Sequence, residues 1–350
     1  MKIGTITFHW ATNYGAVLQA YALQKYLNQI GYDTEIINYI PLRVKLIQNI
    51  MWIKNLKISE FVKEKKIKKF RKEYLQLSKT SYYTNNSLIK KCNDYDVYIC
   101  GSDQIWNESF VLSAEKKPTL SYYLNFVKEG KKRISYASSF GTDRLSIEVL
   151  NLVKPELEKF NAISVRENSG KKIIEDMDLE ATVVVDPTLL LEKDLYEELI
   201  RDKKIKKEYQ LFSYILHSNQ ITAKKINDYV FKKYFNEKID KRYNQEPISV
   251  FEWLFNIKNS RFVLTNSFHG AVFAIIFHKP FIVISVEGSK MNDRIITLLD
   301  SVGLENRIIE TFNEDKIDNL MKDYIDWKQV DYRVQQLRKS SIDFIKKVIP

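Results

Sequence analysis

Short apolar runs alternate with longer amphipathic stretches along most of the chain. Residues 2–7 form the first apolar run, and residues 34–39 form the second. Between them the apolar positions recur at helical spacing and end before Gly31, a typical C-terminal helix residue. These positions are Ala16, Ala20, Leu23, Leu27 and Ile30. A strand, a helix and a second strand in this order predict a right-handed parallel βαβ unit.

The same alternation continues through the rest of the chain and predicts an α/β fold. One stretch departs from it: residues 43–80 carry many lysines around apolar positions at helical spacing, which predicts a basic amphipathic helical excursion. Further strands are expected at 97–100, 133–137, 162–165, 182–185, 211–216, 261–265 and 281–285.

The chain length predicts more than one domain. At 350 residues it exceeds the size at which one hydrophobic core usually stops growing. We expect an N-terminal α/β domain over 1–195, a C-terminal α/β domain over 196–330, and a C-terminal helix over 331–350 that can pack back on the first domain. The boundary falls in a charge-rich stretch without a glycine-rich hinge.

Composition narrows the class of protein further. Hydrophobic residues make up 45% of the chain and charged residues 28%, which is ordinary for a globular protein. No apolar run approaches the roughly 20 residues of a membrane-spanning helix, and the first residues do not resemble a secretory signal. We therefore expect a cytoplasmic protein, with peripheral contact at the inner face of the membrane as an option.

The net charge and the absence of known binding motifs limit the classes of ligand that we expect. The formal charge of +11 favours an anionic partner, which could be nucleic acid, an anionic membrane surface or a phosphorylated substrate. The chain has no P-loop, dinucleotide-binding or zinc motif, and the spacing of Cys92 and Cys100 suits neither a metal nor a redox pair. We expect no metal site and no resident cofactor.

Polar residues follow the predicted strands, and ligands of open parallel sheets bind beyond the carboxyl ends of strands. Asn13, Tyr14 and Gly15 stand where the first strand turns into a helix, whose first amides could bind an anion. The alternative is that Asn13 only caps the helix and Gly15 only packs.

A second polar turn, residues 101–107, follows the strand at 97–100. Ser102 could contact substrate, and Asp103 is the candidate catalytic base. Alternatively, Ser102 and Asp103 cap a helix whose first turn holds Trp106 against the core.

Arg166 ends another predicted strand. Its planar guanidinium could bind a phosphate or a carboxylate through two parallel hydrogen bonds. A salt bridge to Glu167 or Asp186 is the alternative.

The second half carries one sharp signal, a strand followed by a polar turn and an apolar helix at 265–277. Asn266 and Ser267 lie in the turn and could bind phosphate, and His269 lies at the helix start, where it could move a proton near neutral pH. Arg294 borders the apolar stripe of a later helix and could face a ligand. A lone histidine is more often structural, which is the alternative for His269.

The motifs together resemble the polysaccharide pyruvyl transferase family from residue 1 to about 308. The resemblance implies two Rossmann-like domains that face a cleft, similar to B-type glycosyltransferases. The resemblance rests on motifs that occur in this order along the chain: residues 12–19, 101–106, 135–137, 164–167, 186–187 and 267–270, followed by Arg294 and residues 302–304.

The resemblance also implies an activity. The enolpyruvyl carbons of phosphoenolpyruvate, a co-substrate, would be moved onto a sugar of a bacterial surface or exopolysaccharide precursor to form a pyruvate ketal with release of phosphate. The acceptor would be a glycan or a lipid-linked sugar. In this hypothesis Arg166, Arg294 and the turn before His269 bind the anion, while His269 and Asp103 transfer protons.

Other functions stay open on the sequence alone. The same fold would serve a glycosyltransferase that uses a nucleotide sugar, and a catalytically silent subunit of a glycan assembly complex would keep the motifs without turnover. Nucleic acid is not the expected partner, because the basic residues of 54–72 alternate with apolar positions and accompany no known nucleic-acid motif. They could face anionic lipid instead, or only water.

Overall fold

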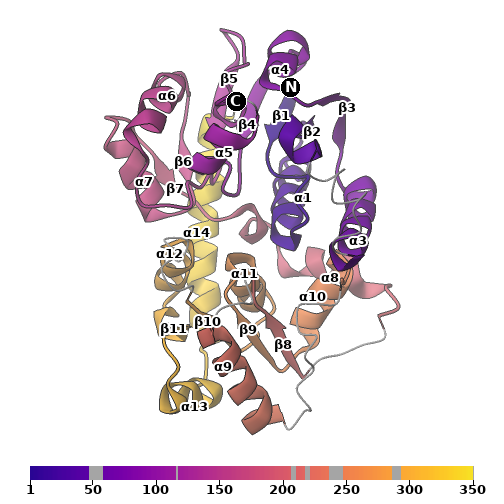
Figure 1. Ribbon diagram of the computed structural model, residues 1–350, viewed down its shortest axis with the longest axis vertical. Helices are drawn as coiled ribbons and strands as arrows, with labels where there is room; N and C mark the ends of the chain where they lie inside the picture. Colours follow the sequence, from indigo (N-terminus) through magenta and orange to yellow (C-terminus); the bar gives the residue numbers. More distant parts are fainter. Residues whose placement is uncertain are drawn as a thin grey trace. The chain divides into compact units, whose positions relative to one another are not determined.

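Two separate parallel sheets organise the chain in the computed structural model (Figure 1). The structure describes residues 1–46, 58–115, 117–205, 210–216, 221–235, 247–285 and 293–349. Unit 1 comprises Met1–Leu191 and Leu337–Pro350, and unit 2 comprises Glu192–Gln336.

The sheet of unit 1 has the order β3-β2-β1-β4-β5 and is parallel throughout. Two short parallel strands, β6 and β7, extend it through isolated bridges from Ile134 to Ala162 and from Ser138 to Val165. The strands are β1 Lys2–Ile6, β2 Asp33–Tyr39, β3 Leu77–Tyr82, β4 Val97–Cys100, β5 Lys132–Ser135, β6 Ser164–Val165 and β7 Thr182–Val183.

Helices connect these strands, as parallel pairing requires. The first, α1 (Tyr14–Gln29), is buried on nearly all sides, which explains its many small and apolar residues. The others are α3 Ile58–Tyr74, α4 Asn85–Lys91, α5 Glu108–Ser113, α6 Ile147–Leu157, α7 Asn168–Glu175, and the 3₁₀ turns η1 Ser121–Tyr123 and η2 Pro187–Leu189.

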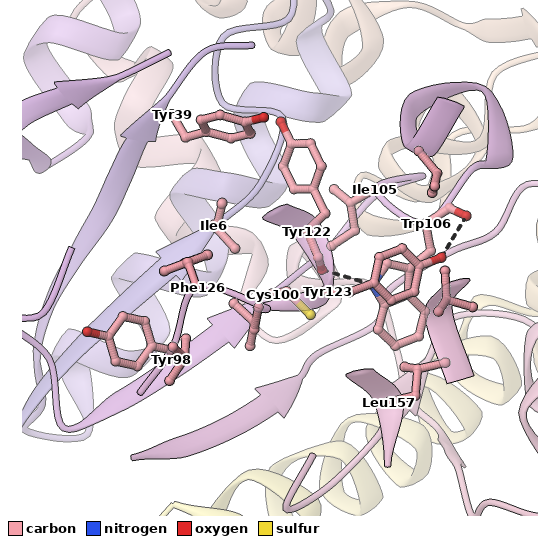
Figure 2. Close-up of a cluster of buried hydrophobic side chains, with 14 of the residues drawn as sticks. Ile6, Tyr39, Tyr98, Cys100, Ile105, Trp106, Tyr122, Tyr123, Phe126 and Leu157 are labelled. Carbon is pink, nitrogen blue, oxygen red and sulfur yellow. Dashed lines mark hydrogen bonds between the residues drawn. The ribbon is translucent and has the colours of Figure 1, made fainter. Parts of the chain in front are cut away.

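The core of unit 1 is rich in aromatic side chains (Figure 2). Trp106 is fully buried and stacks on Tyr123, with ring centroids 5.3 Å apart and planes within 10°. Its indole Nε1 donates to the carbonyl oxygen of Tyr122 at 3.0 Å, so the polar edge of the ring is satisfied. This packing anchors the loop that follows β4.

Unit 2 contains a four-stranded sheet of order β11-β10-β9-β8, again with every pair parallel. Its strands are β8 Leu211–Tyr214, β9 Phe262–Thr265, β10 Phe281–Ile284 and β11 Ile308–Ile309. Its helices are α8 Lys193–Arg201, α9 Ile221–Val230 with the π-helical turn η3 Phe231–Phe235, α10 Val250–Asn259, α11 Phe268–Ile276, α12 Asp293–Val302, η5 Glu305–Arg307 and α13 Glu314–Lys322.

The stretch at 43–80 is less simple than the predicted helical excursion. Helix α3 occupies Ile58–Tyr74, but residues 77–82 form β3 at the edge of the sheet, and residues 47–57 lie outside the described part. The strand escaped prediction because its central residues, Lys79 to Ser81, are all exposed, so its pattern lacks the alternation of a half-buried strand.

The end of the chain contains two further helices. In α13, Ile317 and Leu320 are buried, whereas Tyr324 follows the helix and is largely exposed. Helix α14, Trp327–Val348, begins in unit 2 and ends in unit 1. Within unit 1, the hydroxyl of Ser341 accepts a hydrogen bond from the Val185 amide at 2.9 Å.

Candidate functional site

The strand order of unit 1 reverses between β1 and β4, and ligands of open α/β sheets bind at such a switch point. The loops that leave these two strands are tied together by Gln19 of α1. Its Nε2 donates to Thr7 Oγ1 at 2.8 Å, and its Oε1 accepts from the Ser102 amide at 3.1 Å. Thr7 Oγ1 in turn donates to the Ser102 carbonyl oxygen at 3.0 Å. The sequence motifs around residues 13 and 102 therefore share one rigid edge.

At this edge, the start of α1 takes the capping form that the sequence left open as an alternative. Asn13 Oδ1 accepts from the Ala16 amide at 3.2 Å, and Tyr14 and Gly15 are buried. Lys63 of α3 lies over the Tyr14 ring, with Nζ 4.7 Å from the centroid. Burial lowers the pKa of Lys63, opposed by the charge of Glu60. Sequence reasoning missed Lys63, because no motif spacing connects it to residue 14.

Arg166, at the end of β6, lies at the centre of three carboxylates. Its Nη1 is 2.8 Å from Asp186 Oδ2, its Nη2 is 3.5 Å from Asp103 Oδ1, and its Nε is 3.9 Å from Glu167 Oε2. Burial acts to lower the pKa of Arg166, but the carboxylates, Asp186 foremost, outweigh it and raise that pKa above its ordinary value.

Arg166 therefore forms the salt bridge that the sequence left as the alternative to anion binding. Its side chain is 1% exposed, so it is not placed to receive a substrate anion. The predicted substrate-binding role is corrected accordingly: the guanidinium links the ends of β4, β6 and β7 and positions Asp103.

Asp103 is the member of this cluster that reaches the surface. Its side chain is 16% exposed, against 0% for Asp186 and 1% for Glu167. Its backbone has a φ of 76°, which costs a non-glycine residue free energy and is common at functional sites. The Gln104 amide donates to its Oδ1 at 2.8 Å. A carboxylate oriented in this way can accept a proton from a ligand.

Ser102 is fully buried beside Asp103 and has a structural role. Its Oγ lies 2.7 Å from the Ala137 carbonyl oxygen, to which it donates, and 3.3 Å from Asp186 Oδ2. Its predicted direct contact with substrate is therefore corrected. The capping alternative was wrong as well, since Asn107 caps the following helix, α5.

In unit 2, β9 turns directly into α11. Ser267 caps this helix, its Oγ accepting from the Gly270 amide at 3.4 Å. Asn266 forms two hydrogen bonds with the backbone of Leu216, which follows β8. Its Oδ1 accepts from the Leu216 amide at 2.6 Å, and its Nδ2 donates to the Leu216 carbonyl oxygen at 2.5 Å. The side chains of both residues thus form hydrogen bonds that stabilise the turn. The helix start and the residues near it are the remaining parts that can bind an anion.

The structure places Arg294 beside Phe268, the residue before His269 at the start of α11. The Arg294 Cζ lies 5.9 Å from the ring centroid of Phe268. That ring stands at 88° to the His269 imidazole, with centroids 5.1 Å apart. A guanidinium therefore lies beside the first turn of α11, where the helix N-terminus can help to bind an anion and His269 can transfer a proton.

The described residues include no group of three or more His, Cys, Asp or Glu side chains that could hold a metal ion. Both cysteines are buried thiols, and burial raises the pKa of Cys92 to about 12. Across the described part of the chain, no helix is both long and apolar enough to cross a membrane.

Comparison with known families and structures agrees with this architecture. The family model described as polysaccharide pyruvyl transferase matches residues 13–288. No curated protein matches the sequence.

Among solved structures, the UDP-GlcNAc 2-epimerase of Neisseria meningitidis bound to UDP-GlcNAc is 10% identical, with 99% of this chain and 100% of that chain covered and a TM-score of 0.54. The UDP-GlcNAc 2-epimerase of Methanocaldococcus jannaschii is 14% identical, with 97% and 100% covered and a TM-score of 0.53. Identities this low show the fold alone. They confirm the predicted α/β fold of two Rossmann-like domains, similar to B-type glycosyltransferases.

Proposed function

Because the chain belongs to the polysaccharide pyruvyl transferase family, we propose that it moves the enolpyruvyl carbons of phosphoenolpyruvate onto a sugar of a bacterial surface or exopolysaccharide precursor. The product is a pyruvate ketal, and phosphate is released. The acceptor is a glycan or a lipid-linked sugar.

The position of the Arg294 guanidinium beside Phe268, at the start of α11, is the observation that carries the proposal. Phosphoenolpyruvate bears a phosphate and a carboxylate, so its site needs a fixed cation and oriented amides. Arg294 and the start of α11 supply both within unit 2. His269 lies in the first turn of the same helix, which supports its role as the proton donor.

In the proposed reaction His269 donates a proton to the methylene carbon of phosphoenolpyruvate, which leaves an oxocarbenium-like centre at the neighbouring carbon. One sugar hydroxyl forms a C–O bond to that centre and releases its proton. The bond between that carbon and the phosphate oxygen then breaks. A second hydroxyl of the same sugar closes the ketal, and its proton is released with the phosphate.

Asp103 is proposed as the base that accepts the proton of the first hydroxyl. Its partial exposure and its ion pair with Arg166 support this role, because the pair orients the carboxylate. Arg166, Asp186 and Glu167 act as positioning residues. Each general acid or base of this kind is worth roughly 10²- to 10⁴-fold in rate.

Thermal-shift titration with phosphoenolpyruvate tests the assignment of unit 2. A ligand that binds only the folded protein stabilises it by about 2.7 kcal/mol at a hundredfold excess over Kd. We expect phosphoenolpyruvate to raise the melting temperature of the wild type and of the control Arg261→Ala, whose arginine is exposed before β9. Arg294→Ala should lose the shift, and Asp103→Asn should keep it.

Other results would redirect the proposal. Stabilisation by UDP-GlcNAc or another nucleotide sugar, with none by phosphoenolpyruvate, would indicate a glycosyltransferase. Binding of phosphoenolpyruvate without phosphate release in the presence of glycan acceptors would indicate a catalytically silent subunit. Normal phosphate release by His269→Gln would remove the histidine from the mechanism.

A further inference from the structure

We propose that α3 docks this protein on an anionic lipid surface through a lysine face made of Lys65, Lys68, Lys69 and Lys72. The inference rests on the geometry of unit 1 and does not depend on the proposed function. All four side chains are exposed. Their spacing of three and four residues places them on one side of the helix, over about 10 Å of its axis.

Helix α3 lies beside α1 in unit 1 (Figure 1), and it packs against α1 with the side opposite the lysine face. Ile67 and Phe70 are fully buried. Tyr21 of α1 makes edge contacts with Phe70 at 5.8 Å and with Tyr74 at 6.2 Å between ring centroids. The helix cannot rotate about its axis without breaking this packing, so it presents the lysines as a pre-arranged row.

One cation of α3, Arg71, points inward instead and connects the helix to the loop after β1. Arg71 forms an ion pair with Glu64, and its Nη1 donates to the His9 carbonyl oxygen at 3.3 Å. Glu64 also accepts from Thr12 Oγ1 at 2.6 Å. These bonds hold α3 to the loop that leads to Asn13.

Charge and shape favour a lipid surface over nucleic acid. The face consists of lysines, which are flexible point charges suited to diffuse anionic surfaces, whereas arginine forks suit base and phosphate recognition. Among the described side chains of α3 no aromatic is exposed, so there is no platform on which bases could stack. Exposed Glu60 and Glu73 offset part of the charge, Glu73 lying 3.9 Å from Lys69.

Co-sedimentation with vesicles of phosphatidylcholine, with and without phosphatidylserine, tests the proposal. We expect binding that needs phosphatidylserine and disappears near 1 M salt, where the Debye length is about 3 Å. Each basic residue near such a surface is worth roughly fivefold in partitioning. The variant with all four lysines of the face changed to glutamine should therefore lose binding by at least about tenfold, even with the offset from the acids.

The matched control changes four exposed lysines of unit 2 to glutamine, which lowers the net charge equally; they are Lys224, Lys225, Lys322 and Lys328. Equal losses in the two variants, or no binding by the wild type, would overturn the proposal. Binding to duplex DNA that is lost with the lysine face, without vesicle binding, would assign the face to nucleic acid. The phosphoenolpyruvate shift should survive in both variants, which separates this test from that of the proposed function.

Discussion

At the scale of single residues, burial decides which polar side chains can contact a ligand. Ser102 and Arg166 belong to the motifs that suggested a site, yet both are buried and satisfy partners within unit 1. His9, in the loop after β1, is a similar case. It is buried, with Nδ1 3.2 Å from the Thr7 carbonyl oxygen and Nε2 3.3 Å from Asn38 Oδ1.

Burial of His9 should make stability depend on pH. Desolvation lowers its pKa to about 4, although the hydrogen bonds to Thr7 and Asn38 act to raise it. The unfolded chain, with a pKa near 6.5, binds the proton first as pH falls. Stability is therefore complete above about pH 6.5 and is lost toward pH 4, by up to about 3 kcal/mol.

Urea unfolding of the wild type and of His9→Gln across this pH range measures that effect. The variant should show a shallower loss of unfolding free energy between pH 6.5 and 4, because the titrating group is gone. Parallel curves for the two proteins would show that carboxylates alone cause the acid sensitivity.

At the scale of elements, the start of α11 packs closely against the end of β9. A Cβ added at Gly270 would lie 2.3 Å from Thr265 Oγ1, which is itself held by a 2.7 Å bond to the Tyr214 carbonyl oxygen. Glycine therefore lets α11 begin immediately after the strand, and this puts His269 at the helix start.

Gly270→Ala should destabilise unit 2 by about 1–3 kcal/mol, the usual cost of overpacking a close contact. Gly170→Ala is the matched control, since it is also a buried helical glycine but its nearest neighbour would be 3.4 Å away. The control should be neutral or stabilising by up to about 1 kcal/mol, because alanine favours helix. Urea denaturation followed by circular dichroism compares them, and similar losses would refute the close-packing account.

At the scale of the whole molecule, a segment from the end of the chain completes the first unit. Residues 337–350 belong to unit 1, although more than a hundred residues of unit 2 separate them from Leu191. Arg338 Nε donates to the Leu189 carbonyl oxygen at 2.7 Å, and Ser341 Oγ accepts from the Val185 amide. Ile345 is buried in the same segment.

Ser341→Ala should destabilise unit 1 by about 1–3 kcal/mol, because it leaves the buried Val185 amide without its acceptor. The neighbouring Ser340→Ala changes an exposed residue and should stay within about 0.5 kcal/mol of the wild type. The hydrogen-exchange rate of the Val185 amide measures the loss of this hydrogen bond directly. Unchanged protection in Ser341→Ala would mean that the segment is not needed to close unit 1.

The sequence by itself determined the alternation of strands and helices. Buried parallel strands such as Val97–Cys100 are short apolar runs, and α1 shows its stripe at helical spacing, because both patterns are set by local geometry. The ordered motifs also led to the family. The edge strand β3 escaped this reasoning, since exposed positions carry no periodic signal.

Only the tertiary structure decided the partners of individual side chains. It placed Arg166 among three carboxylates, laid Lys63 over Tyr14, and placed Arg294 beside Phe268. The physical reason is that a residue's charge and hydrogen-bonding capacity are local properties, whereas its burial and partners depend on contacts between segments far apart in the chain.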